Sequence, residues 1–182
     1  MSTLILLRHG QSEWNKQNLF TGWYDCDLTD LGIKEALQAG KLLLEAELVP
    51  DVTYSSLQKR AIKTAELVHQ SLNKKMSIHK NWRLNERHYG DLTGLNKSDA
   101  KIMFGEQKIQ EWRRSYATPP PPISPENRFN PNNNDAYLDL PKELIPLSEC
   151  LADVVDRLIP YWHSNIAPEL KSGKKVLIAA HG

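Results

Sequence analysis

The sequence is poor in cysteine, with only Cys26 and Cys150, and neither has another cysteine or a histidine at a spacing typical of a metal site. Small proteins that are stabilised by disulfides carry several closely spaced cysteines, which are absent here. We therefore expect two free thiols in a reduced, cytoplasmic protein.

The sequence also lacks an excess of charge and a long apolar run. Its 23 basic and 22 acidic residues give a net charge of +1, too little to hold nucleic acid or an anionic membrane non-specifically. The apolar run at 3–7 has the length of a strand and breaks at Arg8 and His9, which excludes a signal-peptide core or a membrane span there. We expect small-molecule partners, and any anion site must be local.

A chain of 182 residues with 40% hydrophobic residues fits a single domain, 1–182. The exception to ordinary composition is the segment at about 117–147, which is rich in proline and asparagine. We expect a long insertion without regular structure, of the kind that forms lids or binding loops.

Short runs that predict strands alternate with segments of helical periodicity. Strands are predicted at 4–7, 52–54, 77–79 and 176–180. Helices are predicted after an N-cap at Thr29, after Ser55 and Ser56, over 95–116 with a break near Gly105, and from Ser148 to about Ile166 with a kink at Pro160. This alternation predicts an α/β fold with a mainly parallel sheet flanked by helices, whose first strand is buried on both faces.

The first and last predicted strands end alike, in His9-Gly10 and His181-Gly182. Ligands of open α/β sheets bind beyond the carboxyl ends of the strands, so we expect both imidazoles in one pocket. Each glycine removes a side chain and is expected to let an anion approach the backbone N–H groups.

Arginines accompany these histidines. Arg8 precedes His9, and Arg60 lies early in the second predicted helix. Guanidinium groups suit phosphate, and a neutral imidazole, which nearby cations keep unprotonated, suits covalent phosphoryl transfer. The alternative is a metal site that uses His9, His181, Glu86 and His88, which is disfavoured because the arginines repel a cation.

Several motifs resemble a known family. Arg8-His9-Gly10-Gln11-Ser12-Glu13-Trp14-Asn15 is similar to the signature of the histidine phosphatase superfamily. Four further segments resemble the phosphoglycerate mutase branch of this superfamily, which depends on 2,3-bisphosphoglycerate. They are residues 20–25, 84–90, 94–97 and 112–114, and they follow one another in the same order as in that branch over nearly the whole chain. Relatives commonly carry Glu where this chain has Gln11.

The resemblance implies that His9 is phosphorylated and that Arg8, Arg60 and His181 surround the transferring group. It implies that Glu86 is the proton donor and acceptor, which suits a reaction that alternately protonates an alkoxide and deprotonates a hydroxyl. For substrate binding it implies a larger set: Arg8, Asn15, Thr21, Gly22, Arg60, Glu86, Arg87, Tyr89, Lys97, Arg113, Arg114 and Gly182.

The function implied is the glycolytic and gluconeogenic interconversion of 2-phosphoglycerate and 3-phosphoglycerate. 2,3-Bisphosphoglycerate is the intermediate and priming phosphoryl donor, no metal is needed, and a homodimer or homotetramer is expected. Alternatives are a phosphatase or a bisphosphoglycerate mutase on the same scaffold, and a truncated phosphate binder without turnover. The last stays open because family members continue past His181-Gly182 with a further helix and strand, so the sequence suggests a chain that lacks this C-terminal portion.

Overall fold

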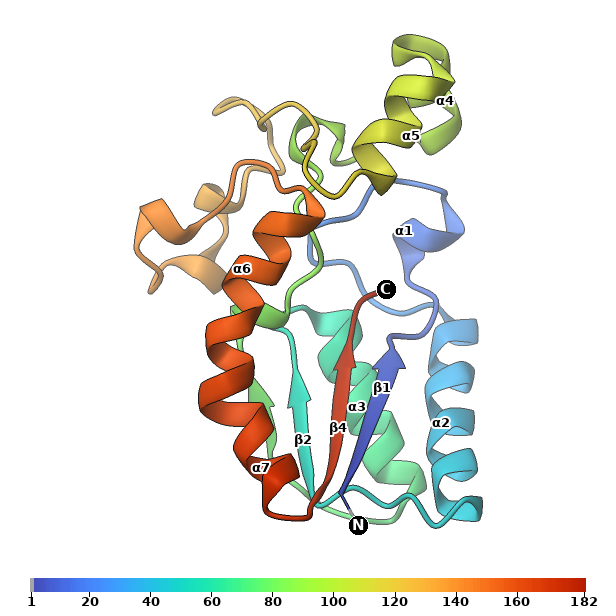
Figure 1. Ribbon diagram of the computed structural model, residues 1–182. Helices are drawn as coiled ribbons and strands as arrows, with labels where there is room; N and C mark the ends of the chain where they lie inside the picture. The colour runs from blue at the N-terminus through green and yellow to red at the C-terminus, as the bar shows by residue number, and fades with distance from the viewer. Residues whose placement is uncertain (1) are drawn as a thin grey trace. The chain divides into compact units, whose positions relative to one another are not determined.

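The computed structural model describes residues 2–182 (Figure 1). The chain forms two compact units. Unit 1 comprises residues 2–13, Asp25–Glu86 and Arg157–Gly182, and unit 2 comprises Trp14–Tyr24 and Arg87–Asp156.

Unit 1 contains a four-stranded parallel sheet. Its strands are β1 (Thr3–Arg8), β2 (Val52–Ser55), β3 (Ile78–Lys80) and β4 (Lys175–Ala180), in the spatial order β1-β4-β2-β3. Leu6 pairs with Ile178 between β1 and β4, and Tyr54 pairs with Ile178 between β2 and β4. The predicted parallel sheet is confirmed, and the last strand in sequence lies between β1 and β2.

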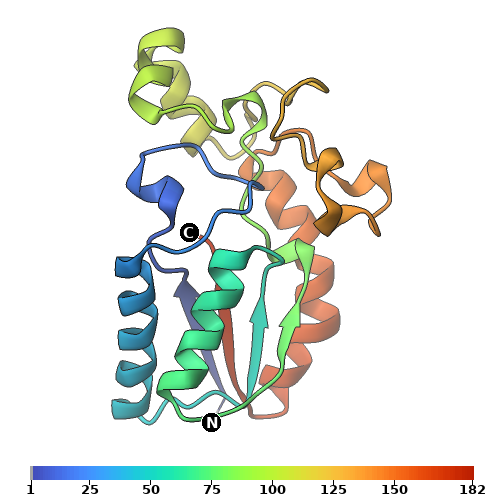
Figure 2. The ribbon, with the colours of Figure 1, turned by 180° about the vertical axis from the view of Figure 1, so that it is seen from behind.

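Helices cover both faces of this sheet (Figure 1, Figure 2). On one face, Leu177 of β4 packs with α2 (Asp30–Glu45) and α3 (Lys59–Ser71). On the other, Val176 and Ile178 pack with the end of α6 (Leu151–Tyr161) and with α7 (Ala167–Lys171). Neighbouring residues of β4 therefore point into opposite cores, as expected for a central parallel strand.

Strand β1 is more exposed than the sequence predicts. Ile5 and Leu7 pack against the core beside α2, but Leu4 and Leu6 are 39% and 72% exposed. The prediction that this strand is buried on both faces is wrong, because β1 is an edge strand with one face that no described element covers.

Two of the predicted helix caps are also wrong. Thr29 caps α2 as predicted, accepting from the N–H of Gly32 at 3.1 Å. Helix α3 instead begins at Lys59 after Gln58, whose side chain makes no capping bond, so Ser55 and Ser56 are not its caps. The reason is that these serines still belong to the end of β2 and the turn beyond it.

Ser148 does not cap α6. Its hydroxyl donates to the carbonyl of Pro120 at 2.6 Å, and the Asp153 carboxylate accepts from the N–H of Cys150 at 2.8 Å instead. Pro160 lies inside the helix, which passes into a π-helical turn at Trp162–Ile166 and continues as α7. A proline lacks the N–H of a regular helical turn, and the irregular turn lies between Pro160 and Pro168.

Unit 2 has little regular structure. It contains α4 (Lys97–Phe104) and α5 (Glu106–Arg114), separated at Gly105 as predicted, and most of the short helix α1 (Glu13–Lys16). Residues 117–147 form no α-helix or strand and hold only three 3-10 turns, Pro131–Asn133, Asp135–Tyr137 and Lys142–Leu144. The predicted lack of regular structure over this segment is therefore confirmed.

Over residues 2–182, the structure contains no helix with both the length and the apolar character needed to cross a membrane.

Candidate active site

His9 directly follows β1 and is held at the end of the sheet. Its backbone N–H donates to the carbonyl of Ala180 at 3.0 Å, and its side chain is buried. The ring Nδ1 lies 2.7 Å from the carbonyl oxygen of Gly10. A carbonyl can only accept, so Nδ1 carries the proton and Nε2 keeps its lone pair. The structure thus gives His9 a nucleophilic Nε2.

The surroundings of His9 keep this ring neutral. Burial, followed by the positive charges of Arg60 and Arg8, lowers its pKa to about 3, although the bond to the Gly10 carbonyl acts in the opposite direction. The two cations act in the direction expected from the sequence, but burial makes the largest contribution. At neutral pH the nitrogen is available for attack on phosphorus.

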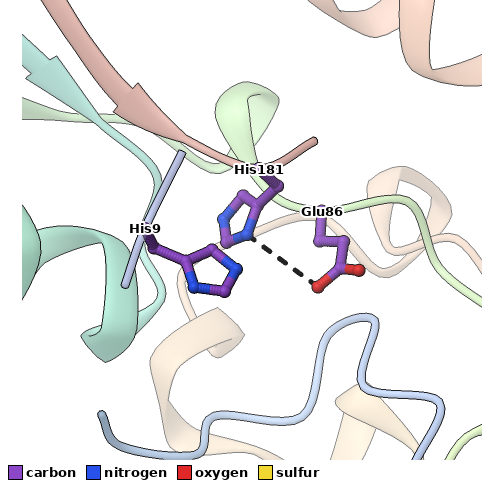
Figure 3. Close-up of side chains that lie close together, drawn as sticks. All are labelled: His9, Glu86 and His181. Carbon is purple, nitrogen blue, oxygen red and sulfur yellow. Dashed lines mark ion pairs between the residues drawn. The ribbon is translucent and has the colours of Figure 1, made fainter. Parts of the chain in front are cut away.

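His181 follows β4 and lies beside His9, with ring centroids 5.1 Å apart (Figure 3). Its Nε2 is 2.9 Å from the hydroxyl oxygen of Ser56, and its Nδ1 is 3.8 Å from a carboxylate oxygen of Glu86. Burial first, then the charge of Arg60, holds the pKa of His181 well below its usual value. The two strand-end histidines meet as the sequence predicts.

Arg60 and Glu86 form the charged part of the site. Arg60 is fully buried, and its Nη2 is 2.6 Å from a carboxylate oxygen of Glu86. Gln58 joins the pair, because its side-chain carbonyl accepts from Arg60 at 3.2 Å and from the N–H of Glu86 at 3.1 Å. Glu86 keeps 18% of its side chain exposed, so the carboxylate can exchange protons with a ligand.

Gly10 has a different role from the one expected. A Cβ on Gly10 would lie 2.2 Å from the carbonyl oxygen of Gly32, so the absent side chain lets the turn after β1 pass close to α2. Its N–H donates to the hydroxyl of Thr64 at 3.1 Å rather than facing an anion. Gly182 lies against Arg8, whose Cδ would be 3.1 Å from an added Cβ.

His9, Glu86 and His181 also offer three metal-ligand atoms within 4.8 Å of one another. The guanidinium 2.6 Å from Glu86 opposes a cation there and favours an anion. His88, the fourth residue of the metal alternative, belongs to unit 2, where its Nδ1 accepts from the N–H of Gly90 at 2.9 Å.

Unit 2 holds the other residues of the predicted substrate set, and several gather around two aromatic rings. The guanidinium of Arg87 lies 5.0 Å from the centre of the Tyr89 ring. Lys97 and Arg113 each place their charge 5.9 Å from the centre of the Phe20 ring. Arg87 also donates to the carbonyl of Arg113 at 2.8 Å. Three cations are thus held together within this unit.

The remaining members of the set lie nearby in the same unit or close in sequence. Thr21 is buried, and Gly22, at φ +54°, approaches the backbone of Tyr89, where an added Cβ would be 3.1 Å from its nitrogen. Asn15 lies in α1, and Arg114 is the last residue of α5, where it is exposed.

Sequence reasoning missed four residues that support the site: Ser56, Gln58, Thr64 and Arg157. Ser56 had a sequence signal, but that signal was interpreted as a helix cap. The others had none, since Gln58 reaches Glu86, Thr64 reaches Gly10 and Arg157 reaches Glu86, all distant in sequence.

Comparison with known proteins agrees with this geometry. Residues 4–182 match the model of the histidine phosphatase superfamily (branch 1). The chain is 52% identical over 180 residues to a 2,3-bisphosphoglycerate-dependent phosphoglycerate mutase of Streptomyces avermitilis, covering 98% of this chain and 71% of that protein. It is 53% identical over 181 residues to the protein of the same name from Rhodococcus jostii, covering 99% of this chain and 71% of that one.

Solved structures share the fold. A mycobacterial glucosyl-3-phosphoglycerate phosphatase in complex with VO3 superposes with a TM-score of 0.75 at 24% identity, covering 100% of this chain and 77% of that one. YhfR of Bacillus stearothermophilus has a TM-score of 0.71 at 27% identity, over 100% and 75% of the two chains.

Proposed function

Because the chain belongs to the 2,3-bisphosphoglycerate-dependent phosphoglycerate mutases of the histidine phosphatase superfamily, we propose that it interconverts 2-phosphoglycerate and 3-phosphoglycerate through a phosphorylated His9. The observation that carries this proposal is the neutral, buried His9, with a free Nε2, beside Arg60, Glu86 and His181. These are the nucleophile, cation and proton carrier that phosphoryl transfer to a histidine requires.

In the first half-reaction, Nε2 of His9 forms a bond to phosphorus while the bond from phosphorus to the substrate oxygen breaks. Glu86 gives its proton to the departing oxygen. In the second half-reaction, Glu86 takes the proton of the attacking hydroxyl as the phosphoryl group leaves His9. Arg60 and Arg8 stabilise the negative charge of the transferring group throughout.

His181 is proposed to bind an oxygen of the transferring group. Its Nδ1 is buried and has no hydrogen-bond partner within residues 2–182, and its nearest charged neighbour is the Glu86 oxygen at 3.8 Å. Buried polar atoms are normally paired, so this nitrogen is fitted to a ligand oxygen. The same observation supports phosphate as the ligand class.

The cationic and hydrogen-bonding residues of unit 1 suit 2,3-bisphosphoglycerate as the priming phosphoryl donor. Bound 2,3-bisphosphoglycerate supplies the first phosphoryl group, and Arg8, Arg60 and His181 are the residues of unit 1 that would hold it. The family resemblance also assigns substrate binding to residues of unit 2: Asn15, Thr21, Gly22, Arg87, Tyr89, Lys97, Arg113 and Arg114. A ligand with several negative charges suits a set with four cations.

We also propose a cytoplasmic location and a homodimeric or homotetrameric state. Both cysteines are free and buried, which suits a reducing compartment. The proposed assembly follows from the family resemblance.

The test is incubation of the protein with 2,3-bisphosphoglycerate, followed by intact mass measurement and an acid-lability test. 3-Phosphoglycerate is then added, and 2-phosphoglycerate and free phosphate are measured. We expect an acid-labile phosphate that His9→Ala abolishes and His163→Ala, a change at an exposed histidine, retains. Formation of 2-phosphoglycerate should exceed phosphate release.

The other outcomes identify the alternatives. Release of phosphate without 2-phosphoglycerate would establish a phosphatase, and net synthesis of 2,3-bisphosphoglycerate a bisphosphoglycerate mutase. Binding without label or turnover would leave a phosphate binder and overturn the proposal.

A further inference from the structure

Arg157 lies in α6, far in sequence from the segment that carries Glu86, yet its side chain is bound to that segment. The guanidinium donates to four backbone carbonyls: Trp82 at 3.4 Å, Arg83 at 2.7 Å, Asn85 at 2.9 Å and Glu86 at 3.2 Å. Arg157 is only 7% exposed, so these bonds are made in a desolvated setting. A single side chain thus fixes the backbone on which Glu86 is mounted.

The same segment is also tied to the turn after β2. The Asn85 side-chain carbonyl accepts from the N–H of Leu57 at 3.0 Å, and the Gln58 side-chain carbonyl accepts from the N–H of Glu86 at 3.1 Å. The segment is therefore bonded both to α6 and to the turn that leads into α3. Only the Glu86 side chain is left to reach Arg60 and His181.

From this arrangement we infer that Arg157 is a positioning residue for the proton transfer by Glu86, acting through the carbonyls of Asn85 and Glu86. The inference rests on the proposed function and extends it to a residue outside the reacting groups. A proton donor works only when its oxygen is within hydrogen-bond reach of the leaving oxygen, so a displacement of about 1 Å costs rate.

The charge of Arg157 supports the same role. Burial and then the charge of Arg60 contribute most to holding the pKa of His181 low, and the charge of Arg157 acts in the same direction. Loss of the Arg157 guanidinium would therefore change both the position of the Glu86 backbone and the electrostatic environment of His181.

The first test compares two phosphoryl donors in single-turnover labelling of His9. 2,3-Bisphosphoglycerate has an alkoxide leaving group that needs the Glu86 proton, whereas the phenolate of p-nitrophenyl phosphate departs without one. We expect Arg157→Ala to slow labelling by bisphosphoglycerate at least tenfold and labelling by p-nitrophenyl phosphate less than about threefold. Equal slowing with both donors would overturn the inference, because it would indicate general damage to the pocket.

A double-variant cycle tests the route of the effect. Added to Glu86→Gln, which already lacks the acid, Arg157→Ala should slow bisphosphoglycerate labelling less than about threefold further. If the rate reduction in the double variant equals the product of the two single-variant reductions, Arg157 acts independently of Glu86. Arg83→Ala is the matched control, since Arg83 also joins this segment to α6, by donating to the carbonyl of Arg157 at 3.0 Å. If Arg83→Ala also slows labelling by bisphosphoglycerate more than labelling by p-nitrophenyl phosphate, loss of any bond between this segment and α6 has the same effect, and the assignment to Arg157 is wrong.

Amide hydrogen exchange tests the positioning itself, without need for turnover. The N–H of Glu86 should exchange at least tenfold faster in Arg157→Ala than in the wild type, while the β1 and β4 amides are unchanged. Unchanged exchange at Glu86 overturns the inference even if the enzyme is active. A wild type that neither donor labels overturns the proposed function, and the exchange result still decides the positioning. If Arg157→Ala does not fold, Arg157→Lys, which keeps the charge without the planar fork, decides in the same assays.

Discussion

In unit 1 the arginine beside the two histidines is fully buried and lies 2.6 Å from a carboxylate. In unit 2, Arg87, Lys97 and Arg113 lie over aromatic rings and are only half-buried. Burial strengthens electrostatic effects, and the lowered pKa values of His9 and His181 show this in unit 1. Half-exposed cations instead attract an anion without tuning a reacting group. The difference suggests chemistry in unit 1 and recognition in unit 2.

The contacts that hold the charged and catalytic side chains in place also differ between the two units. The unit 1 groups are fixed by hydrogen bonds from strand ends and turns, such as His9 to Gly10 and Glu86 to Gln58. In unit 2, Arg87 is held by one backbone carbonyl and the face of Tyr89. Kinetics of matched variants test this division, because substitutions in unit 1 should change kcat and substitutions in unit 2 should change KM.

The largest effect is expected for Glu86→Gln in unit 1. The amide cannot donate and accept the proton, so kcat should fall by about 10²- to 10⁴-fold while KM changes little. Steady-state kinetics with 3-phosphoglycerate measure both constants. Glu66→Gln, at an exposed carboxylate of α3, should leave both unchanged. A rise in KM at constant kcat would show that Glu86 binds substrate rather than moving a proton.

The site of this largest effect was predictable because it depends on a general property of parallel sheets. His9 and His181 end separate strands, and the carboxyl ends of parallel strands share one edge, so two short sequence runs sufficed to bring the rings together. The family resemblance placed Arg60 and Glu86 in the same site, but their ion pair was not predicted, since no local pattern links residues 26 positions apart.

What the sequence could not predict depends on distant partners. Ser56 follows a strand and looks like a helix cap, but its hydroxyl contacts an imidazole 125 residues away. Arg157 is indistinguishable in sequence from a solvated helical arginine, and only the carbonyls of another segment make it a buried one. The exposure of β1 likewise depends on its place at the sheet edge, which its apolar run does not encode.

A smaller effect is expected for Arg87→Ala in unit 2. Loss of one charge-assisted contact typically costs about 1.5 to 3 kcal/mol, so KM for 3-phosphoglycerate should rise roughly 10- to 150-fold with kcat nearly unchanged. Arg128→Ala is the matched control, because Arg128 also lies over an aromatic ring of unit 2, 4.6 Å from the centre of Phe129, but is outside the proposed binding set. A fall in kcat for Arg87→Ala without a change in KM would remove the division between the units.

The smallest effect concerns acid stability. The pKa of His9 is about 3 in the folded protein, against about 6.5 for an unperturbed histidine. Between these values the unfolded chain binds one more proton than the folded chain, so the free energy of unfolding falls as the pH falls through 6.5 towards 3. Above about pH 7.5 His9 contributes nothing to the pH dependence. Between pH 7.5 and 5.5 its contribution to the loss of stability is about 1 kcal/mol.

Urea unfolding of the wild type and His9→Gln at the two pH values measures this contribution, with His163→Gln as the baseline for replacing an exposed imidazole. The wild type should lose about 1 kcal/mol more than His9→Gln on acidification. Amide exchange, corrected for its intrinsic pH dependence, should then show a larger acceleration in β4 of unit 1 than in α5 of unit 2. Equal acceleration in both would mean that the buried histidines of unit 1 do not set its acid sensitivity, and the electrostatic contrast between the units would be lost.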